Sequence, residues 1–304
     1  MQLIIQPDDG VEPVLSAIEK AKKAIDIAVF RLDIKEVIAG LGAAVKRGVA
    51  VRAQIAHTNK GGDKALRKLE ARLLDAGVTV SRSPDELIRY HGKMMIIDSR
   101  RLYVNGFNFT WDDVERSRSF GAVTTSAKLV REGIRMFQAD LDRQPYTSAC
   151  TDLVVSPDNS RVRLSAFIKG ARKQLCIYDP SITDPRMLRL IAGRAQAGVE
   201  VRIIGKASKG ATVSAQKHPG KRLHVRAIIR DGRQAFIGSQ SLRRLELDHR
   251  REIGVLVREV AVVKKMLAVF EADWALTSAA QKTAGADALD ITADGAPARA
   301  SDAG

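Results

Sequence analysis

The stretch His91-Gly-Lys-Met-Met-Ile-Ile-Asp-Ser-Arg-Arg-Leu-Tyr-Val-Asn-Gly-Phe-Asn108 has a second copy, His224-Val-Arg-Ala-Ile-Ile-Arg-Asp-Gly-Arg-Gln-Ala-Phe-Ile-Gly-Ser-Gln-Ser241. Each copy is typical of a β-hairpin that opens with a histidine and carries a basic residue two positions later. The spacing is constant, since 224 − 91, 231 − 98 and 254 − 121 all give 133 for the histidines, the aspartates and a later pair of glycines. This duplication predicts two homologous halves whose histidines share one pocket.

The repeat continues outside the two hairpins. Residues 21–27 are similar to residues 171–177, and residues 47–52 to residues 197–202, both at a spacing of 150. The second half is therefore 17 residues shorter (150 − 133) before its histidine. Short apolar runs alternate with helical patterns, which predicts an α/β fold. We expect strands over residues 25–29, 49–53, 174–177 and 199–204, and helices over residues 34–46, 65–75, 186–197 and 260–275.

The repeat also predicts the domain organisation. We expect one half over residues 1–146 and the other over residues 151–277, joined by a connector over residues 144–150. A hydrophobic content of 45% is ample for a buried core. The tail over residues 278–304 is rich in Ala, Gly and Asp and poor in large apolar residues, so we expect it to be disordered.

The motif residues resemble those of the phospholipase D superfamily, whose signature is H-x-K-x4-D-x6-G-S-x-x-N or a close variant. The matching positions are His91, Lys93, Asp98 and Asn108 in the first copy and His224, Asp231, Gly238 and Ser239 in the second. The resemblance covers nearly all of residues 1–277. It implies two α/β/α sandwich halves related by a pseudo-twofold axis, with a single active site at the seam.

The resemblance also implies a double displacement at phosphorus that needs no metal or other cofactor. One neutral histidine attacks phosphorus to form a phosphohistidine, and the other protonates the leaving oxygen and then activates water or an acceptor alcohol. By analogy we assign His91 as nucleophile and His224 as general acid, with the reverse assignment left open. Lys93, Arg226 and Asn108 are expected to hold the non-bridging phosphate oxygens.

Alternation along a strand arranges the remaining candidates. Side chains two positions apart point to the same face, so each histidine is expected to lie beside its basic neighbour. The same holds on the return strands for Gly106 and Asn108 and for Ser239 and Ser241, and we expect the two serines to bind the phosphate of the substrate. Asp98 and Asp231 fall at the turns, where we assign them a structural rather than a catalytic role.

The sequence departs from the family pattern at four positions. These are Arg226 in place of lysine, Gly106 in place of serine, Ser241 in place of asparagine, and Ser119 in place of an acid. Glu252 lies 28 residues after His224, where the family places the acid that orients its histidine. Asp112, Asp113 and Glu115 are candidates for the acid that the first copy lacks. Pooled across one cleft, the two copies make about one full set, which favours an asymmetric working site over a degenerate phosphate-binding remnant.

The charge of the chain favours polyanionic partners. Fifty basic and 35 acidic residues give a net charge of +15, and the pI is about 10.0. Basic residues adjoin both motifs, among them Lys206, Lys209, Lys217, Lys221 and Arg222 directly before His224. We therefore expect an electropositive rim around the site, with Lys221 and Arg222 binding the phosphate of the substrate.

The substrate class stays open among three hypotheses. Hydrolysis or transfer of a phospholipid at an anionic membrane surface comes first, a nuclease acting on DNA or RNA second, and a non-catalytic module that binds polyanions third. The chain has no apolar run of about 18 residues, no signal-peptide pattern and only two cysteines, Cys150 and Cys176. We expect a cytoplasmic monomer without a metal site.

Overall fold

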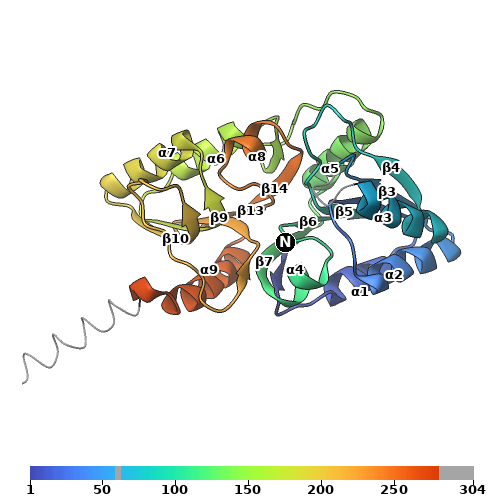
Figure 1. Ribbon diagram of the computed structural model, residues 1–304, viewed down its shortest axis with the longest axis horizontal. Coiled ribbons are helices and arrows are strands. Elements are labelled where there is room, and N and C mark those ends of the chain that lie inside the picture. The colour runs from blue at the N-terminus through green and yellow to red at the C-terminus, as the bar shows by residue number, and fades with distance from the viewer. Residues whose placement is uncertain (59–62, 281–304) are drawn as a thin grey trace, which may run out of the picture.

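The computed structural model describes residues 1–58 and 63–280, and within them the chain forms two mixed sheets. The first sheet has eight strands in the order β1-β7-β6-β5-β2-β3-β4, with β11 added beside β7. The second has six strands in the order β10-β9-β12-β13-β14-β8. The two halves lie side by side, the first coloured blue to green and the second yellow to orange (Figure 1).

The helices and strands alternate in both halves, as the sequence predicts. The first half contains β1 (Gln2–Gln6), α1 (Glu12–Lys20), β2 (Ala24–Val29), α2 (Lys35–Lys46), β3 (Ala50–Ile55), α3 (Asp63–Asp75), β4 (Thr79–Arg82), β5 (Met94–Ile97), β6 (Arg101–Asn105), α4 (Trp111–Glu115), β7 (Ser117–Thr124) and α5 (Ala127–Leu141). The second half contains β8 (Leu153–Ser156), α6 (Ser160–Lys169), β9 (Gln174–Ile182), α7 (Pro185–Gln196), β10 (Glu200–Ala207), β11 (Arg222–Leu223), β12 (Arg226–Arg230), β13 (Gln234–Gly238), α8 (Arg244–Asp248), β14 (Glu252–Val257) and α9 (Val260–Ala275).

The two sheets follow one plan. The order β7-β6-β5-β2 in the first corresponds to β14-β13-β12-β9 in the second. The 17-residue difference lies where the first half carries α3 and β4 and the second carries a loop that leads to β11. The predicted tail lies, from residue 281 onward, outside the described residues. Within the described ranges, no helix is long and apolar enough to cross a membrane.

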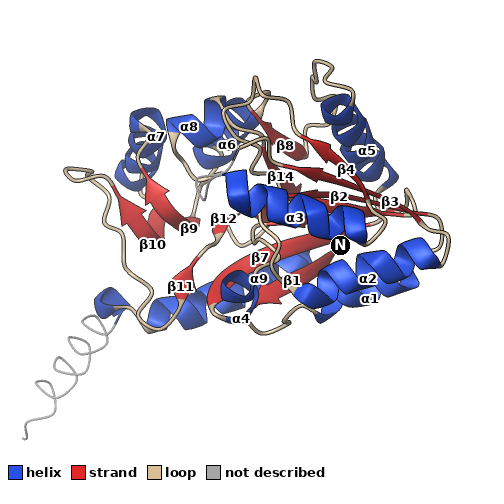
Figure 2. Ribbon diagram, turned by 45° about the vertical axis from the view of Figure 1, so that its right-hand side comes forward, coloured by secondary structure: helices blue, strands red, loops and turns tan. Residues whose placement is uncertain are grey.

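Three apolar clusters hold the layers together. In the first half one cluster joins α1 and α2 to one face of the sheet, and Figure 2 shows α5 against the other face. A second cluster packs α6 and α7 on the second sheet. The third contains Ile96 and Phe120 of the first sheet together with Ile237 of the second, so it runs across the seam between the halves. The halves therefore share one continuous core where the motif strands meet.

The motif aspartates sit at the turns of both hairpins. Asp98 and Asp231 have φ angles of 53° and 54°, and the next residue is also left-handed in each case. Three residues lie between the paired strand ends of each hairpin, which are Ile97 and Arg101 in the first and Arg230 and Gln234 in the second. The Asp98 carboxylate accepts hydrogen bonds from the backbone N–H groups of residues 22–24, at 2.6 to 3.1 Å. Asp231 accepts the corresponding bonds from residues 172–174. Each aspartate thus ties its turn to the strand next to it.

The segment before each motif histidine pairs with the opposite half. Tyr90 forms a parallel bridge with Arg251, whose carbonyl accepts a 2.8 Å hydrogen bond from the backbone N–H of His91. In the second copy Leu223 of β11 pairs with Arg118 of β7 in the same way. The two contacts are equivalent, since 223 − 90 and 251 − 118 both give 133. The histidine segments therefore cross the seam.

This crossing corrects one prediction about the hairpins. We expected the histidines to open the first strands, but β5 begins at Met94 and β12 at Arg226. His91 and His224 precede those strands because their backbone bonds go to the other sheet. The small polar positions likewise follow the return strands, since β6 ends at Asn105 and β13 at Gly238. The side chains of the site therefore come from the segments at the ends of the strands. The alternation of side chains along a strand does not determine how they are placed.

Candidate functional site

His91 is held by an acid from the other half. Its Nδ1 lies 2.8 Å from Oε2 of Glu252, the first residue of β14, and both side chains are buried. The Phe30 ring packs edge-on against the imidazole at a centroid distance of 4.5 Å. The Glu252 carboxylate and the Phe30 ring together fix the orientation of His91.

His224 faces an acid of the first half. Its Nδ1 lies 3.1 Å from Oδ2 of Asp113, at ion-pair distance but without hydrogen-bond alignment. Ser119, the position equivalent to Glu252 (252 − 119 = 133), donates its hydroxyl to the backbone carbonyl of His224 at 3.1 Å. Ser119 thus stands at the position that Glu252 holds in the other copy, and the acid beside His224 is instead Asp113 of α4.

The acids thus pair crosswise, which corrects the sequence-based pairing. Glu252 was expected to orient His224, yet it contacts His91, because the His91 segment lies along the start of β14. Asp113 was one of three unplaced candidates. Glu246 was missed, although it is the counterpart of Asp113 at the same spacing (246 − 113 = 133). The repeat spacing of 133 between Asp113 and Glu246 is the feature of the sequence by which both acids could be identified.

The paired acids also cap the loops that follow the return strands. Oδ2 of Asp113 accepts from the backbone N–H and the side-chain amide of Asn108, at 2.8 and 2.7 Å. Oε2 of Glu246 accepts from the backbone N–H of Ser241 at 2.6 Å. Both carboxylates are 1% exposed, so burial and these bonds fix the two loops beside the histidines.

Lys93 is the most deeply buried cation of the site. Its Nζ donates to the carbonyl of His91 at 2.8 Å and lies 2.9 and 3.0 Å from the two ring nitrogens. Burial, with the charge of Arg226, lowers the pKa of Lys93 to about 7, although Glu252 opposes the shift. Near neutral pH this ammonium is therefore balanced between its charged and neutral forms.

Both histidines are pushed toward the neutral state. Burial, Lys93 and Arg226 lower the pKa of His91 well below its usual value. Burial and the same two cations lower the pKa of His224 as well. Burial raises the pKa of Glu252 above its usual value. Burial is the largest cause of all three shifts, and an anionic substrate would favour the charged form of the histidines.

Arg226 offers a donor to such an anion. Its Nε donates to Oγ of Ser241 at 3.2 Å, while its buried Nη1 has no hydrogen-bond partner among the described residues. A buried donor without a partner is costly unless a ligand completes it. The Ser239 hydroxyl, in contrast, is engaged with the backbone of Ile253, as donor at 3.3 Å and acceptor at 3.1 Å.

Close packing explains one departure from the family pattern. A Cβ atom at Gly106 would lie 3.0 to 3.1 Å from the backbone oxygens of Phe120 and Gly238 and from the Ser119 hydroxyl. At Gly238 it would lie 2.5 Å from the amide oxygen of Gln240. The hairpins approach each other closely here, so a serine at position 106 would require the surroundings to shift.

The structure places the two basic residues that are expected to bind phosphate in different surroundings. Arg222 forms an ion pair with Asp113 and donates to the hydroxyl of Ser117 at 2.8 Å. Lys221 lines a cavity of about 360 Å³ together with Lys206 and Lys217. The structure thus places Lys221 at a basic cavity and Arg222 among the groups that surround Asp113.

Two buried ion pairs close the seam next to the histidine segments. Nε of Arg118 lies 2.7 Å from Asp273 on α9, and Nη2 of Arg251 lies 2.6 Å from Asp140 on α5. All four residues are buried, and the pairs correspond under the repeat, since 251 − 118 and 273 − 140 give 133. They join each half to a helix of the other.

The comparisons with known proteins place the chain in a family. The family model described as "Cardiolipin synthase, PLD-like domain" matches residues 14–141 and 164–274, and so covers both halves. No curated protein matches the chain by sequence.

Solved structures share the fold. The chain is similar to polyphosphate kinase from Porphyromonas gingivalis, with a TM-score of 0.74 and 18% identity over 90% of this chain and 50% of that one. It is also similar to phosphatidylserine synthase from Haemophilus influenzae, with a TM-score of 0.66 and 13% identity over 90% of this chain and 85% of that one. The chain spans half the length of the polyphosphate kinase. With both halves matched by the family model and the two motifs meeting at one seam, the chain belongs to the phospholipase D superfamily, whose members act on phosphodiesters or transfer phosphoryl groups.

Proposed function

We propose that this protein cleaves or transfers a phosphodiester through a phosphohistidine intermediate. The observation that carries the proposal is the crosswise pairing, in which His91 meets Glu252 and His224 meets Asp113 across one seam. Two buried imidazoles, each beside an acid and near two cations, are what a nucleophile and a general acid require.

The geometry supports His91 as the nucleophile. Its Nδ1 is committed to Glu252 and its pKa is lowered, so the ring is neutral and Nε2 carries the lone pair. In the first step Nε2 forms a bond to phosphorus while the bond from phosphorus to the leaving oxygen breaks, and His224 supplies the proton to that oxygen. In the second step His224 accepts a proton from water or an alcohol, whose oxygen displaces His91. Lys93 and Arg226 stabilise the charge on the phosphoryl oxygens.

The pH dependence follows from the direction of these pKa shifts. The general acid must carry a proton, and the free-enzyme pKa values of both histidines lie well below the usual 6.5. Lys93, with a pKa of about 7, loses its charge over the same range. We therefore expect kcat/KM to fall as pH rises from 6 to 8. A profile of kcat/KM that rises over this interval would contradict the assignment of these groups.

The crosswise pairing makes a separate kinetic prediction. With a p-nitrophenyl phosphodiester, whose leaving group departs without a proton, Glu252→Gln should slow the first release of nitrophenolate, because it acts on His91. Asp113→Asn should preserve that burst and slow later turnover, because it acts on His224. Losses of roughly 10²–10⁴-fold are expected when a histidine loses its orienting acid. Rapid-mixing absorbance measures both phases, and the opposite pattern would show that each acid serves the histidine of its own half.

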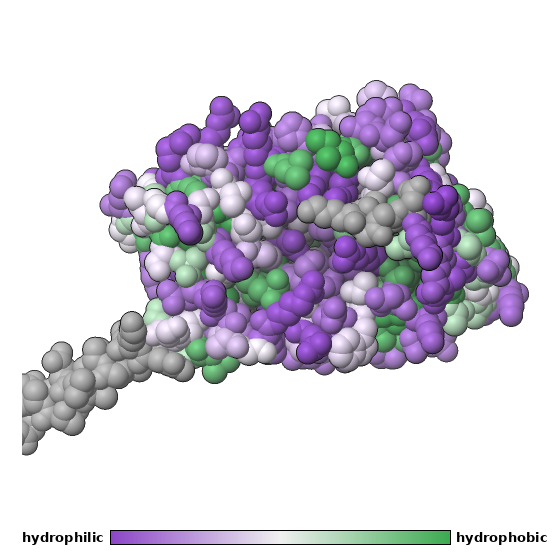
Figure 3. Space-filling model, viewed as in Figure 1, coloured by the Kyte–Doolittle hydropathy of each residue, from purple (hydrophilic) through white to green (hydrophobic). Residues whose placement is uncertain are grey.

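A phospholipid is the first candidate substrate. The matching family model is described as a cardiolipin synthase domain, which supports a lipid phosphodiester. The exposed apolar residues include Ile88, three positions before His91, and Trp111, three positions after Asn108. Both could contact acyl chains at the mouth of the site. The face in Figure 3 is mostly hydrophilic, with apolar residues in small separate patches, so membrane contact would be peripheral.

A nucleic acid is the second candidate, and two basic cavities favour it. One, of about 480 Å³, is lined by Arg31, Lys68 and Arg72 and by Phe30, whose ring touches His91. The other is the 360 Å³ cavity with three lysines on the second half, which Leu223, the neighbour of His224, also lines. Cations on both sides of the histidines suit a strand whose phosphates continue beyond the cleaved bond.

One experiment separates these substrates. The protein is incubated with anionic phospholipid vesicles and a short DNA oligonucleotide in the presence of EDTA, and mass spectrometry identifies the products, with His91→Ala as the control. Phosphatidic acid formed only by the wild type would support the lipid candidate, and shortened DNA formed only by the wild type the nuclease. If neither product forms, the catalytic proposal fails, and salt-dependent binding alone would support a non-catalytic polyanion-binding module.

A further inference from the structure

A basic pocket lies at the far end of the first hairpin from the histidines. It has a volume of about 670 Å³ and opens between α1, the β5–β6 turn and the start of α5. His91 and Lys93 precede β5, whereas the pocket is lined by Ile97 at the end of β5 and by the turn that follows. The four residues of β5 span roughly 13 Å, so the pocket is separate from the candidate active site.

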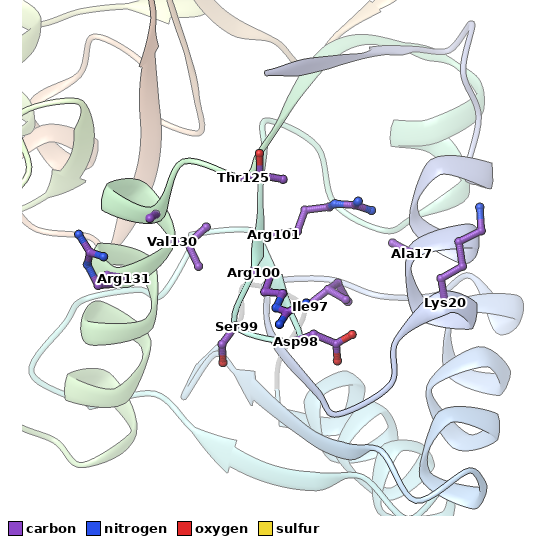
Figure 4. A pocket seen from close by; sticks show the side chains of 11 residues that line it. Ala17, Lys20, Ile97, Asp98, Ser99, Arg100, Arg101, Thr125, Val130 and Arg131 are labelled. Atoms are coloured by element: carbon purple, nitrogen blue, oxygen red, sulfur yellow. The ribbon is translucent and has the colours of Figure 1, made fainter.

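Four cations surround this pocket. Lys20, Arg100, Arg101 and Arg131 line it from three elements, and their side chains are labelled around the opening in Figure 4. All four residues are exposed, and within the described part of the chain none of them makes an ion pair or a side-chain hydrogen bond. The acid at the pocket is Asp98, whose carboxylate is engaged by the three backbone N–H groups of residues 22–24. The pocket therefore has four positive charges and one negative charge, and the negative charge, on Asp98, is already hydrogen-bonded to the backbone.

The internal repeat explains why the pocket is open in the first half. Ala17 lies on its buried floor, and the equivalent residue of the second half is Phe167 (17 + 150). Ile97 corresponds to Arg230 (97 + 133), whose guanidinium stacks on the Phe167 ring at 4.7 Å and donates to its carbonyl at 3.0 Å. A phenylalanine and an arginine thus occupy in the second half the positions that an alanine and an isoleucine hold in the first.

The position of Lys20 follows the same comparison. Its counterpart is Gly170 (20 + 150), where an added Cβ would lie 2.2 Å from the Arg230 guanidinium. In the second half, therefore, side chains fill the position that corresponds to this pocket, and no lysine stands beside it. The open, cation-lined form in the first half is not a requirement of the shared architecture.

We propose that this pocket binds a ligand with at least two phosphate groups and an apolar or aromatic moiety. Four positive charges exceed the charge of roughly −1.5 to −2 that one phosphate group carries, and guanidinium groups suit phosphate oxygens because they donate two parallel hydrogen bonds. The buried floor of Ala17, Ile97 and Val130 fits an apolar group, and the volume is that of a small-molecule site. A nucleoside polyphosphate and the phosphorylated end of a nucleic acid strand share this chemistry.

The repeat supplies a matched control for the test. Arg100→Gln with Arg131→Gln removes two charges from the pocket, while Arg233→Gln with Lys264→Gln removes two charges at the equivalent positions of the second half. All four replaced side chains are exposed. Calorimetric titration of the full chain with ATP, tripolyphosphate and a 5′-phosphorylated dinucleotide measures binding, with circular dichroism to verify folding.

The pocket variant should bind ATP or the dinucleotide at least about tenfold more weakly than the wild type, which corresponds to about 1.4 kcal/mol. The second-half variant should bind within about twofold of the wild type, and both variants should retain phosphodiesterase activity. The stronger of the two nucleotide ligands would identify the source of the ligand, and weaker binding of tripolyphosphate would support the role of the apolar floor. Equal losses in both variants, no loss in the pocket variant, or no binding by the wild type would overturn the proposal.

Discussion

His91→Ala and His224→Ala are each expected to reduce turnover of an unactivated phosphodiester by at least ~10³-fold, because one removes the nucleophile and the other the general acid. A p-nitrophenyl phosphodiester should separate their roles, since its leaving group needs no proton. His91→Ala should give no burst of nitrophenolate. His224→Ala should release about one equivalent per protein and then stall, because the phosphohistidine lacks its general base. Stopped-flow absorbance measures both phases.

His57→Ala provides the control for this pair of variants, because His57 belongs to neither motif and should leave both phases unchanged. If the burst survives in His91→Ala and disappears in His224→Ala, the two histidines exchange roles. If both variants turn over the activated and the unactivated substrate at the wild-type rate, the cluster is not the active site.

Lys93→Met is expected to reduce activity by roughly 10²–10³-fold while it stabilises the fold. The pKa of Lys93 is 10.5 in the unfolded chain and about 7 in the folded protein. Between these values the unfolded chain binds a proton that the folded protein does not bind, so the lysine lowers the free energy of unfolding. The loss of stability that Lys93 causes is largest at and below pH 7, and it decreases as the pH approaches 10.5.

The burial cost of Lys93 at pH 7 is roughly 4 kcal/mol from its pKa shift, and the hydrogen bond to the His91 carbonyl offsets roughly 1–3 kcal/mol of it. Lys93→Met should therefore raise the free energy of unfolding by roughly 1–3 kcal/mol at pH 7, with a smaller gain at pH 10. Urea denaturation at both pH values measures the difference, with the exposed Lys46→Met as the control. A variant less stable than the wild type at pH 7 would contradict the description of Lys93 as a strained buried cation.

Much of the fold could be predicted because the chain carries its own internal alignment. The expected strand over residues 25–29 is observed at Ala24–Val29, and the expected helix over residues 260–275 at Val260–Ala275. The two-halved α/β fold and the superfamily are confirmed. Local periodicity and the spacing of 133 contain this information, because each half folds by the same short-range pattern.

The interior of the site could not be predicted from local pattern. Glu252 is 161 residues from His91, and nothing near either residue indicates that the backbone before the histidine leaves its own sheet. Alternation therefore placed the histidine on a strand that begins three residues later. The partner of His224 could not be identified in this way either, because Ser119 stands at the position equivalent to Glu252 and the acid beside His224 is Asp113 of α4. Applying the repeat to acids as well as to motif residues would have found Glu246 and Asp113 together.

The most direct test of the central claim is to locate the covalent intermediate. His224→Ala is mixed with a substrate that carries an activated leaving group and quenched in alkali, where phosphohistidine survives, and peptide mass spectrometry locates the added group. The two-histidine mechanism predicts a phosphoryl adduct on His91 in near-stoichiometric amount, and none when His91 is also replaced. Turnover by the wild type with no histidine adduct in the trapped protein would contradict it.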